Sequence, residues 1–194
     1  MPPGAIGRLQ LQRGGPLPGY YQPVEVRAPG GALISTAEAG SFQQPAPSPL
    51  LVGLHIGQVY RLRVTHIDGM PGVEVYPTIE IIDRTYPPPG EALRFPIPIV
   101  LTQTELQLAS EGSFVTRVIY LEDPSRAFPH QDNPVEQIWF EAPSGADPLV
   151  VADSLGRPVA ILRIGGRVPD AAGPDSAFLY SSPPMIRFQR PARP

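Results

Sequence analysis

The sequence predicts an all-β fold, an antiparallel β-sandwich of immunoglobulin-like general plan with one short inserted helix. From Val24 onwards, short β-branched and aromatic runs are separated by proline and glycine clusters, which is typical of sandwiches and barrels. Several runs show the two-residue alternation of half-buried strands, and only one segment carries clear helix-capping residues. With 194 residues, 42% of them hydrophobic, the chain is long enough to bury one sizeable core.

Composition divides the chain into three parts. Residues 1–21 are rich in glycine, proline, glutamine and arginine without a sustained period, which indicates an extended N-terminal arm. Residues 22–168 form the predicted sandwich domain. Residues 169–194 have the composition of an extended C-terminal tail, interrupted by two short apolar patches that begin at Phe178 and Met185.

The clearest predicted unit is a hairpin. In its first strand Tyr60, Leu62 and Val64 share one parity and two arginines and a threonine take the other, as a half-buried strand requires. The turn chemistry lies at residues 68–72. The second strand, 72–83, is expected to place Val73, Val75, Ile79 and Ile81 on one face and Glu74, Tyr76, Thr78 and Glu80 on the other.

The segment LRFPIPIVL predicts an edge strand. Pro96 and Pro98 lack N–H groups, and because alternate residues point their N–H groups to the same side, both blank one edge. Phe95, Ile97 and Ile99 keep their donors for the other edge and share one face. The outer rim is therefore expected to resist pairing with another strand.

Thr102–Glu111 is the one predicted helix. Thr102 and Glu105 form a capping box, and Gly112 stands where a left-handed residue ends a helix. The expected apolar side consists of Leu101, Leu106, Leu108 and Ala109.

Further strands are expected after this helix. Residues 113–123 carry apolar side chains on both parities, which favours a central strand. The segments QIWFE (137–141), PLVVA (148–152) and RPVAILRIGGRV (157–168) are also expected to be strands.

Several classes of function are excluded by residue types. The chain has no cysteine, and all 15 of its basic residues are arginine, so disulfides, thiolate nucleophiles, Schiff-base lysines and a P-loop lysine are excluded. The formal net charge of −3 gives no electrostatic reason to bind nucleic acid. The longest apolar stretches, near residues 50 and 95, are too short to cross a membrane as a helix. We expect neither a nucleic-acid partner nor an integral membrane protein.

The segments GQVYRLRVT, GVEVYPTIEIIDR, YPPP, LRFPIPI, GSFVTRVIYLEDP and GRPVAILRIGGR together resemble a group of uncharacterised exported or cell-envelope proteins of planctomycete-type bacteria. The resemblance covers about residues 20–168. It implies an envelope or extracellular location and no established activity. The first 15 residues contain no apolar run that could form the core of a signal peptide, which departs from that pattern.

Histidines and carboxylates do not form a predicted catalytic or metal site. His55 and His66 lie on adjacent predicted strands, but two histidines without a third ligand make a poor metal site. His130 and Asp132 share a loop without a nucleophile elbow, which favours a solvated loop. Carboxylates on one strand face, such as those of residues 74 and 80, are too far apart for acid–base pairs. We predict no catalytic residues, no metal and no cofactor.

Aromatic residues offer a binding surface instead. If Ile138 and Phe140 point inward, Trp139 points outward between Gln137 and Glu141, which suits a sugar face or a protein partner. The opposite parity buries the tryptophan in the core. Tyr76, on the polar face of its strand, is expected to extend such a surface.

The C-terminal patches are the second candidate contact. Phe178 and Tyr180 in one patch, and Met185 and Phe188 in the other, could anchor the tail on a neighbouring molecule by strand addition or groove filling. Alternatively the chain ends are simply loose.

The leading functional hypothesis is a non-catalytic structural or assembly protein of the bacterial envelope or of an extracellular complex. It would act through its terminal arms and interfaces with other protein subunits, including other copies of itself. Arginine-only basic chemistry suits bidentate pairing across interfaces, although GC-rich coding alone would also remove lysine. The alternative is a β-sandwich module that binds a glycan or a peptide.

Overall fold

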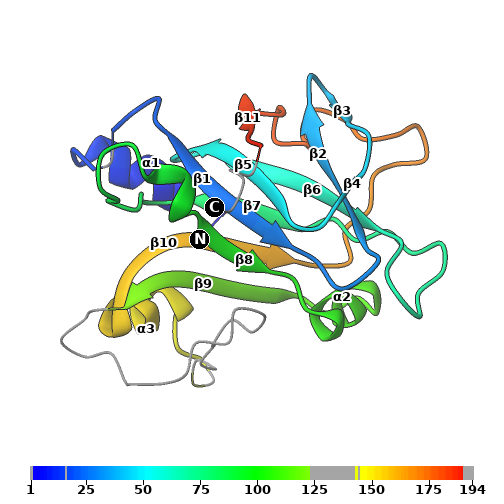
Figure 1. The fold of residues 1–194 in the computed structure, drawn as a ribbon. Helices are drawn as coiled ribbons and strands as arrows, with labels where there is room; N and C mark the ends of the chain where they lie inside the picture. Colours follow the sequence, from blue (N-terminus) through cyan, green and yellow to red (C-terminus); the bar gives the residue numbers. More distant parts are fainter. Residues whose placement is uncertain (1, 16, 123–142, 144, 190–194) are drawn as a thin grey trace.

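The computed structural model describes residues 2–15, 17–122, 143 and 145–189. Two β-sheets pack face to face, and helices lie at the ends and on the outer side of the larger sheet (Figure 1). Strand is the commoner state, 36% against 16% helix. The predicted mostly-β, two-sheet architecture is therefore confirmed at this level.

The smaller sheet has the order β11-β5-β1-β8. Its strands are β1 (Tyr21–Arg27), β5 (Leu50–His55), β8 (Ile97–Val100) and β11 (Met185–Arg187). Strand β1 pairs antiparallel with β5 but parallel with β8, with Val24 opposite Ile97. The prediction of a wholly antiparallel sandwich is therefore wrong at this edge, because alternation within a strand does not encode the direction of its partner.

The larger sheet has the order β3-β2-β6-β7-β10-β9, with β4 paired to β2. Its strands are β2 (Leu33–Glu38), β3 (Ser41–Phe42), β4 (Ala46–Pro47), β6 (Val59–Thr65), β7 (Thr78–Ile81), β9 (Val115–Glu122) and β10 (Gly156–Ile164). The predicted hairpin is confirmed as the antiparallel pair β6–β7. The predicted central strand, β9, is instead the last of this order among the described strands, and α3 packs beside it.

One continuous apolar core lies between the sheets. Tyr60, Leu62 and Val64 of β6 meet Val24 and Val52 of the smaller sheet there. This confirms the alternation predicted for β6. Since an alternating strand presents its apolar side chains to one face only, the two inner faces together exclude water.

Strand β8 is an edge strand, as predicted. Ile97 and Ile99 are fully buried and Pro98 between them is exposed. Phe95 does not join them, because the turn of 3-10 helix η1 (Ala92–Arg94) ends there and leaves its side chain 50% exposed.

Helix α2 (Gln103–Ser110) confirms the predicted helix. Thr102 and Glu105 form the reciprocal capping box, and Gly112 has a φ of +92°. Leu101, Leu106 and Ala109 are buried. Leu108 is exposed, because a helix of eight residues turns only one narrow stripe towards the core.

Two further helices were not predicted. The segment predicted as a strand at 148–152 lies within α3 (Pro148–Leu155), which begins with Asp147 as N-cap and Pro148 in the first turn. The predicted N-terminal arm contains α1 (Ala5–Gln12). The apolar run of α3 fits a strand or a helix equally well, although Asp147 and Pro148 are a local start signal. Helix α1 has no local side-chain cap, so its own sequence gives no such signal.

Helix α1 is held by partners from the larger sheet. It has no local side-chain cap, and the Gly7 N–H donates to the Glu80 carboxylate over 3.1 Å. A Cβ at Gly7 would lie 2.5 Å from the Gly57 Cα, so glycine allows the helix to approach the turn before β6. The carboxylate of a distant strand thus performs the task of an N-cap.

Gly7→Ala is expected to lower the free energy of unfolding by about 1–3 kcal/mol, because the added methyl group overlaps the backbone at Gly57. Gly30→Ala is the matched control, since its Cβ would meet nothing within 4 Å. Urea unfolding followed by circular dichroism measures both. Equal stabilities of the two variants would contradict this account of the contact.

The C-terminal segment is part of the sandwich rather than an extended tail. Strand β11 pairs antiparallel with β5, with Ile186 opposite Gly53. Further upstream, Phe178 and Leu179 are buried at 3% and 0% exposure. Residues 169–189 therefore belong to the folded unit, contrary to the predicted boundary at residue 168.

Tyr60 connects the core to this segment. Its hydroxyl accepts a hydrogen bond from the His55 N–H over 2.8 Å and donates to the Pro184 carbonyl over 2.9 Å. Burial raises the pKa of Tyr60 well above the ordinary value of about 10.

Stability is expected to fall above about pH 10, where the unfolded chain loses the Tyr60 proton and the folded chain keeps it. Because folding raises the pKa of Tyr60, its contribution to the free energy of unfolding is fully present below the pKa of the unfolded chain and is lost as pH rises towards the pKa of the folded chain. For one group, the free energy of unfolding falls by about 1.4 kcal/mol per pH unit in this range. Urea unfolding from about pH 8 to about pH 11, which is one unit above the ordinary tyrosine pKa, measures this loss of stability. Tyr60→Phe should be flatter over this range, and an identical pH dependence would contradict the assignment.

Candidate functional site

The predicted contact residue Tyr76 is not available on the surface. It is 5% exposed, and its ring packs against Phe42 and Phe178, with centroids 5.6 and 5.3 Å away. Its hydroxyl donates to the Glu74 carboxylate, and burial together with this bond raises the pKa of Tyr76. The face expected to be polar is thus covered by a second apolar cluster.

Phe178 and Tyr180 lie against the buried side chain of Arg61. The Arg61 guanidinium lies 4.4 Å from the Phe178 ring centroid and 5.1 Å from that of Tyr180. It also donates to the carbonyls of Phe178 and Tyr76 over 3.0 and 2.9 Å. Burial lowers the pKa of Arg61. Through Arg61, these contacts fasten the C-terminal segment to β6 and to the residues just before β7.

Met185 and Phe188 make intramolecular contacts as well. Met185 begins β11 opposite Leu54 and packs against the main core. A Cβ at Gly53 would lie 2.8 Å from the Phe188 ring, so that ring covers the strand. All four predicted tail anchors therefore contact their own sandwich, and contact with a neighbour remains a prediction.

The remaining predicted residues divide into two groups. Trp139, Gln137 and Glu141, together with the His130–Asp132 loop, lie outside the described residues. His55 instead packs on Tyr21 with ring centroids 3.9 Å apart, and His66 lies within hydrogen-bond distance of Thr65. Among the described residues, no three metal-ligating side chains come together.

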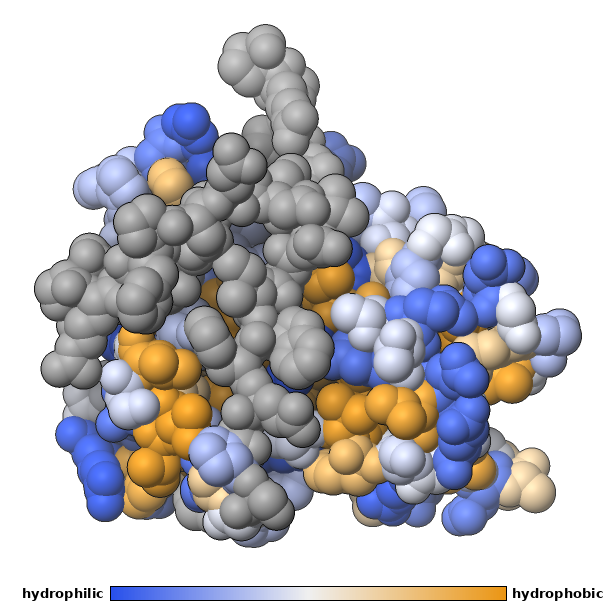
Figure 2. Space-filling model, turned by 90° about the horizontal axis from the view of Figure 1, so that it is seen from below, coloured by the Kyte–Doolittle hydropathy of each residue, from blue (hydrophilic) through white to orange (hydrophobic). Residues whose placement is uncertain are grey.

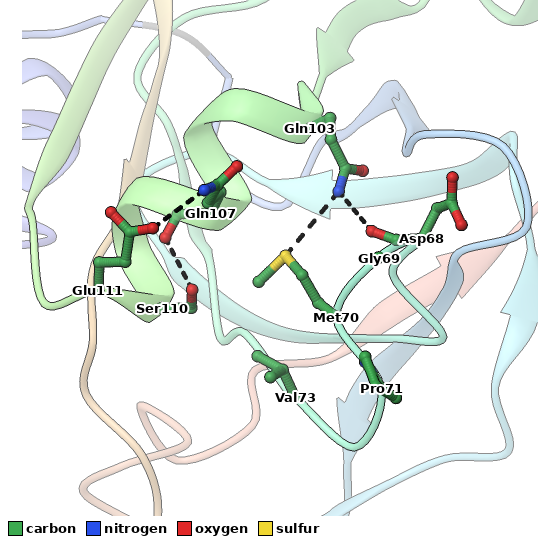
Figure 3. A pocket seen from close by; sticks show the side chains of 9 residues that line it. All are labelled: Asp68, Gly69, Met70, Pro71, Val73, Gln103, Gln107, Ser110 and Glu111. Atoms are coloured by element: carbon green, nitrogen blue, oxygen red, sulfur yellow. Dashed lines mark hydrogen bonds between the residues drawn. The ribbon is translucent and has the colours of Figure 1, made fainter.

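A surface pocket of about 390 Å³ lies between the loop after β6 and helix α2 (Figure 3). The Gln103 amide donates to the Asp68 carbonyl over 2.7 Å, and the Gln107 amide donates to the Glu111 carboxylate over 3.0 Å (Figure 3). Met70 and Val73 supply apolar wall. Both amides already bond within the wall, and the Gln103 amide braces the loop against α2, so neither waits for a ligand.

A second surface surrounds Tyr86, and the sequence did not single it out. We call it the Tyr86 surface; it consists of Tyr20, Asp83, Arg84, Tyr86 and Arg157. The Tyr86 side chain is 62% exposed. The guanidinium groups of Arg84 and Arg157 lie 4.4 and 4.9 Å from its ring centroid. Arg84 also lies 5.6 Å from the ring of Tyr20.

Buried neighbours fix this surface in place. Thr85, immediately before Tyr86, donates its N–H to the buried Gln22 side chain over 2.8 Å. Arg157 is paired with Asp83 and donates to the Arg84 carbonyl over 3.0 Å. Tyr86 is followed by three prolines, whose rings restrict the backbone. An exposed aromatic ring therefore lies within cation–π distance of two arginines on a rigid base.

Within the described residues, Arg84 has no carboxylate partner, and its Nε atom is buried without a hydrogen-bond acceptor. The Tyr86 surface thus has two arginines and one carboxylate, that of Asp83, which pairs with Arg157. The segment DRTYPPP (83–89) does carry a local signal, namely an aromatic residue next to charged residues and a rigid run of prolines. That segment does not indicate the contact with Arg157, which lies 74 residues away from Asp83 in the sequence.

Among the described residues, no helix is long and apolar enough to cross a membrane. Comparisons with protein-family models, with curated proteins and with solved structures found no match for this chain.

Proposed function

We propose that the protein is a non-catalytic binding module of the bacterial envelope or of an extracellular complex. It binds another macromolecule at the Tyr86 surface, while its immunoglobulin-like sandwich serves as the scaffold. The exposed ring of Tyr86, with two guanidinium groups 4.4 and 4.9 Å from its centroid, carries the proposal. Exposed aromatic and arginine side chains on a rigid base are the residues that dominate binding energy at interfaces.

This proposal differs from the assembly hypothesis in where contact occurs. The tail residues Phe178 and Met185, which would have clasped a neighbour, are engaged within the sandwich. The Tyr86 surface needs no rearrangement to meet a partner, so little ordering entropy opposes binding.

The test is co-sedimentation of the purified protein with isolated bacterial envelope fragments. Wild type should appear in the pellet, and Tyr86→Ala combined with Arg84→Gln should shift most of it to the supernatant. Phe114→Ala and Arg94→Gln are matched controls, because both side chains are at least 70% exposed and lie outside this surface. Equal pelleting of all variants, or none of wild type, would contradict the proposal.

Assembly through protein–protein interfaces is the second candidate function. Apolar areas are visible on the face that carries α3 (Figure 2), and Val150 on that helix is 67% exposed. A solvent-facing valine on a helix suits contact with another subunit, including a second copy. Light scattering should show a mass above 20.9 kDa for wild type and the monomer mass for Val150→Arg. Leu17→Arg, at an exposed leucine away from α3 in the sequence, is the control, and a monomeric wild type would end this candidate.

A further inference from the structure

We propose that the Tyr86 surface binds an acidic polysaccharide, with a sugar carboxylate on the edge of Arg84 and the C–H face of the same sugar on the Tyr86 ring. The inference rests on the proposed function and names its ligand class. Uronic acids, sugars that carry a carboxylate directly on the ring, have this chemistry.

The geometry of Arg84 determines which of its atoms can meet the ligand. Its guanidinium contacts the rings of Tyr86 and Tyr20 at 4.4 and 5.6 Å, and such contacts use the flat faces of the group. The N–H bonds lie in the plane and point away from the faces. Since the Nε atom of Arg84 is buried, the edge that a carboxylate meets is the one formed by the two terminal nitrogens, Nη1 and Nη2, which can donate two parallel hydrogen bonds.

The charge balance favours an acidic ligand over a neutral one. Among the described residues, Asp83 pairs with Arg157 and no carboxylate pairs with Arg84. The surface therefore carries one positive charge in excess, in a chain whose formal net charge is −3. That single excess charge is too small for a nucleic-acid backbone, whose binding depends on many basic contacts.

The exposed ring favours a sugar over an acidic peptide. Tyr86, at 62% exposure, offers a flat apolar face of the kind on which sugar rings stack. A uronate brings its carboxylate and its C–H face in one rigid unit, so both contacts form with little loss of conformational entropy. A glutamate side chain brings the carboxylate on a flexible stem and leaves the Tyr86 face uncovered.

The alternation of rings and charges also suits a polymer. Tyr20, Arg84, Tyr86 and Arg157 form a series in which each guanidinium lies within 5.6 Å of a tyrosine ring. A chain of uronates repeats the same pair of features, a ring face and a carboxylate, at every residue. Successive sugars can therefore engage the series.

The test is isothermal titration of the full chain with a short oligogalacturonate at low salt. Wild type should bind, Arg84→Gln should bind about 10-fold more weakly, and Tyr86→Ala about 5-fold more weakly. Tyr86→Phe, which keeps the ring, should bind within about 2-fold of wild type. Arg94→Gln is the matched arginine control and should be unchanged. Thermal unfolding of each variant shows that the fold is intact.

Two further titrants distinguish the sources of the anion. The methyl ester of the same oligosaccharide keeps the sugar rings and removes the charge, and polyglutamate keeps the charge and removes the rings. Both should bind at least 10-fold more weakly than the acid. Equal binding of the ester, equal or tighter binding of polyglutamate, or no binding of oligogalacturonate would each overturn the inference. Envelope co-sedimentation that still depends on Tyr86 would in that case leave the proposed function standing.

Discussion

Replacing Arg163 with methionine should lower the free energy of unfolding by about 3–5 kcal/mol. The Arg163 guanidinium donates to the Glu80 carboxylate over 2.9 Å, and their side chains are 11% and 0% exposed. The substitution leaves a carboxylate buried without its cation. The same carboxylate caps α1 through Gly7, so the N-terminal helix should loosen as well.

Urea unfolding at pH 7 measures this loss, and Arg94→Met is the matched control. Arg94 pairs with Glu91 over 2.9 Å, but the two side chains are 70% and 37% exposed, so its loss should cost less than about 1 kcal/mol. Glu80→Gln together with Arg163→Met should recover part of the stability, because no unpaired charge is then buried. If Arg163→Met were as stable as Arg94→Met, the buried pair would not matter.

Phe178→Ala should lower the free energy of unfolding by about 3–5 kcal/mol. The side chain is 3% exposed, packs edge-on against Tyr76, and lies against the Arg61 guanidinium. Its removal leaves a cavity between the C-terminal segment and the larger sheet and removes a cation–π partner from a buried charge. The effect would be near zero if this segment were a loose tail.

Thermal and urea unfolding of the full chain measure this effect, and Phe114→Ala is the control at a phenylalanine that is 70% exposed. A chain ending at Asp170 should be destabilised even more, because it lacks both Phe178 and β11. A truncated chain as stable as the full one would contradict the account of the C-terminal segment.

Features encoded by neighbouring residues could be predicted from the sequence. The capping box of α2 needs only Thr102 and Glu105, and the hairpin β6–β7 needs only alternation and a turn. The edge position of β8 follows from Pro98, which cannot donate to a neighbour. In each case the residues that decide the structure lie within a few positions of one another.

Features decided by distant partners could not be predicted in the same way. Helix α1 is capped by Glu80, 73 residues from Gly7, and Phe178 is covered by Tyr76 and Arg61. Helix α3 differs, because Asp147 followed by Pro148 is a local start signal. Its run of apolar residues also fits a strand, and only the start signal favours the helix.

Side-chain alternation and helix caps act over a few residues, so the β-strands and the one well-capped helix can be predicted from the sequence. Which aromatic residues are buried and which are exposed depends on tertiary contacts. Tyr76 is covered by segments far away in the chain, whereas Tyr86 is left on the surface close to Arg84 and Arg157. Burial depends on the segment that packs on top of a residue, and a residue's own neighbours in the chain do not specify that segment.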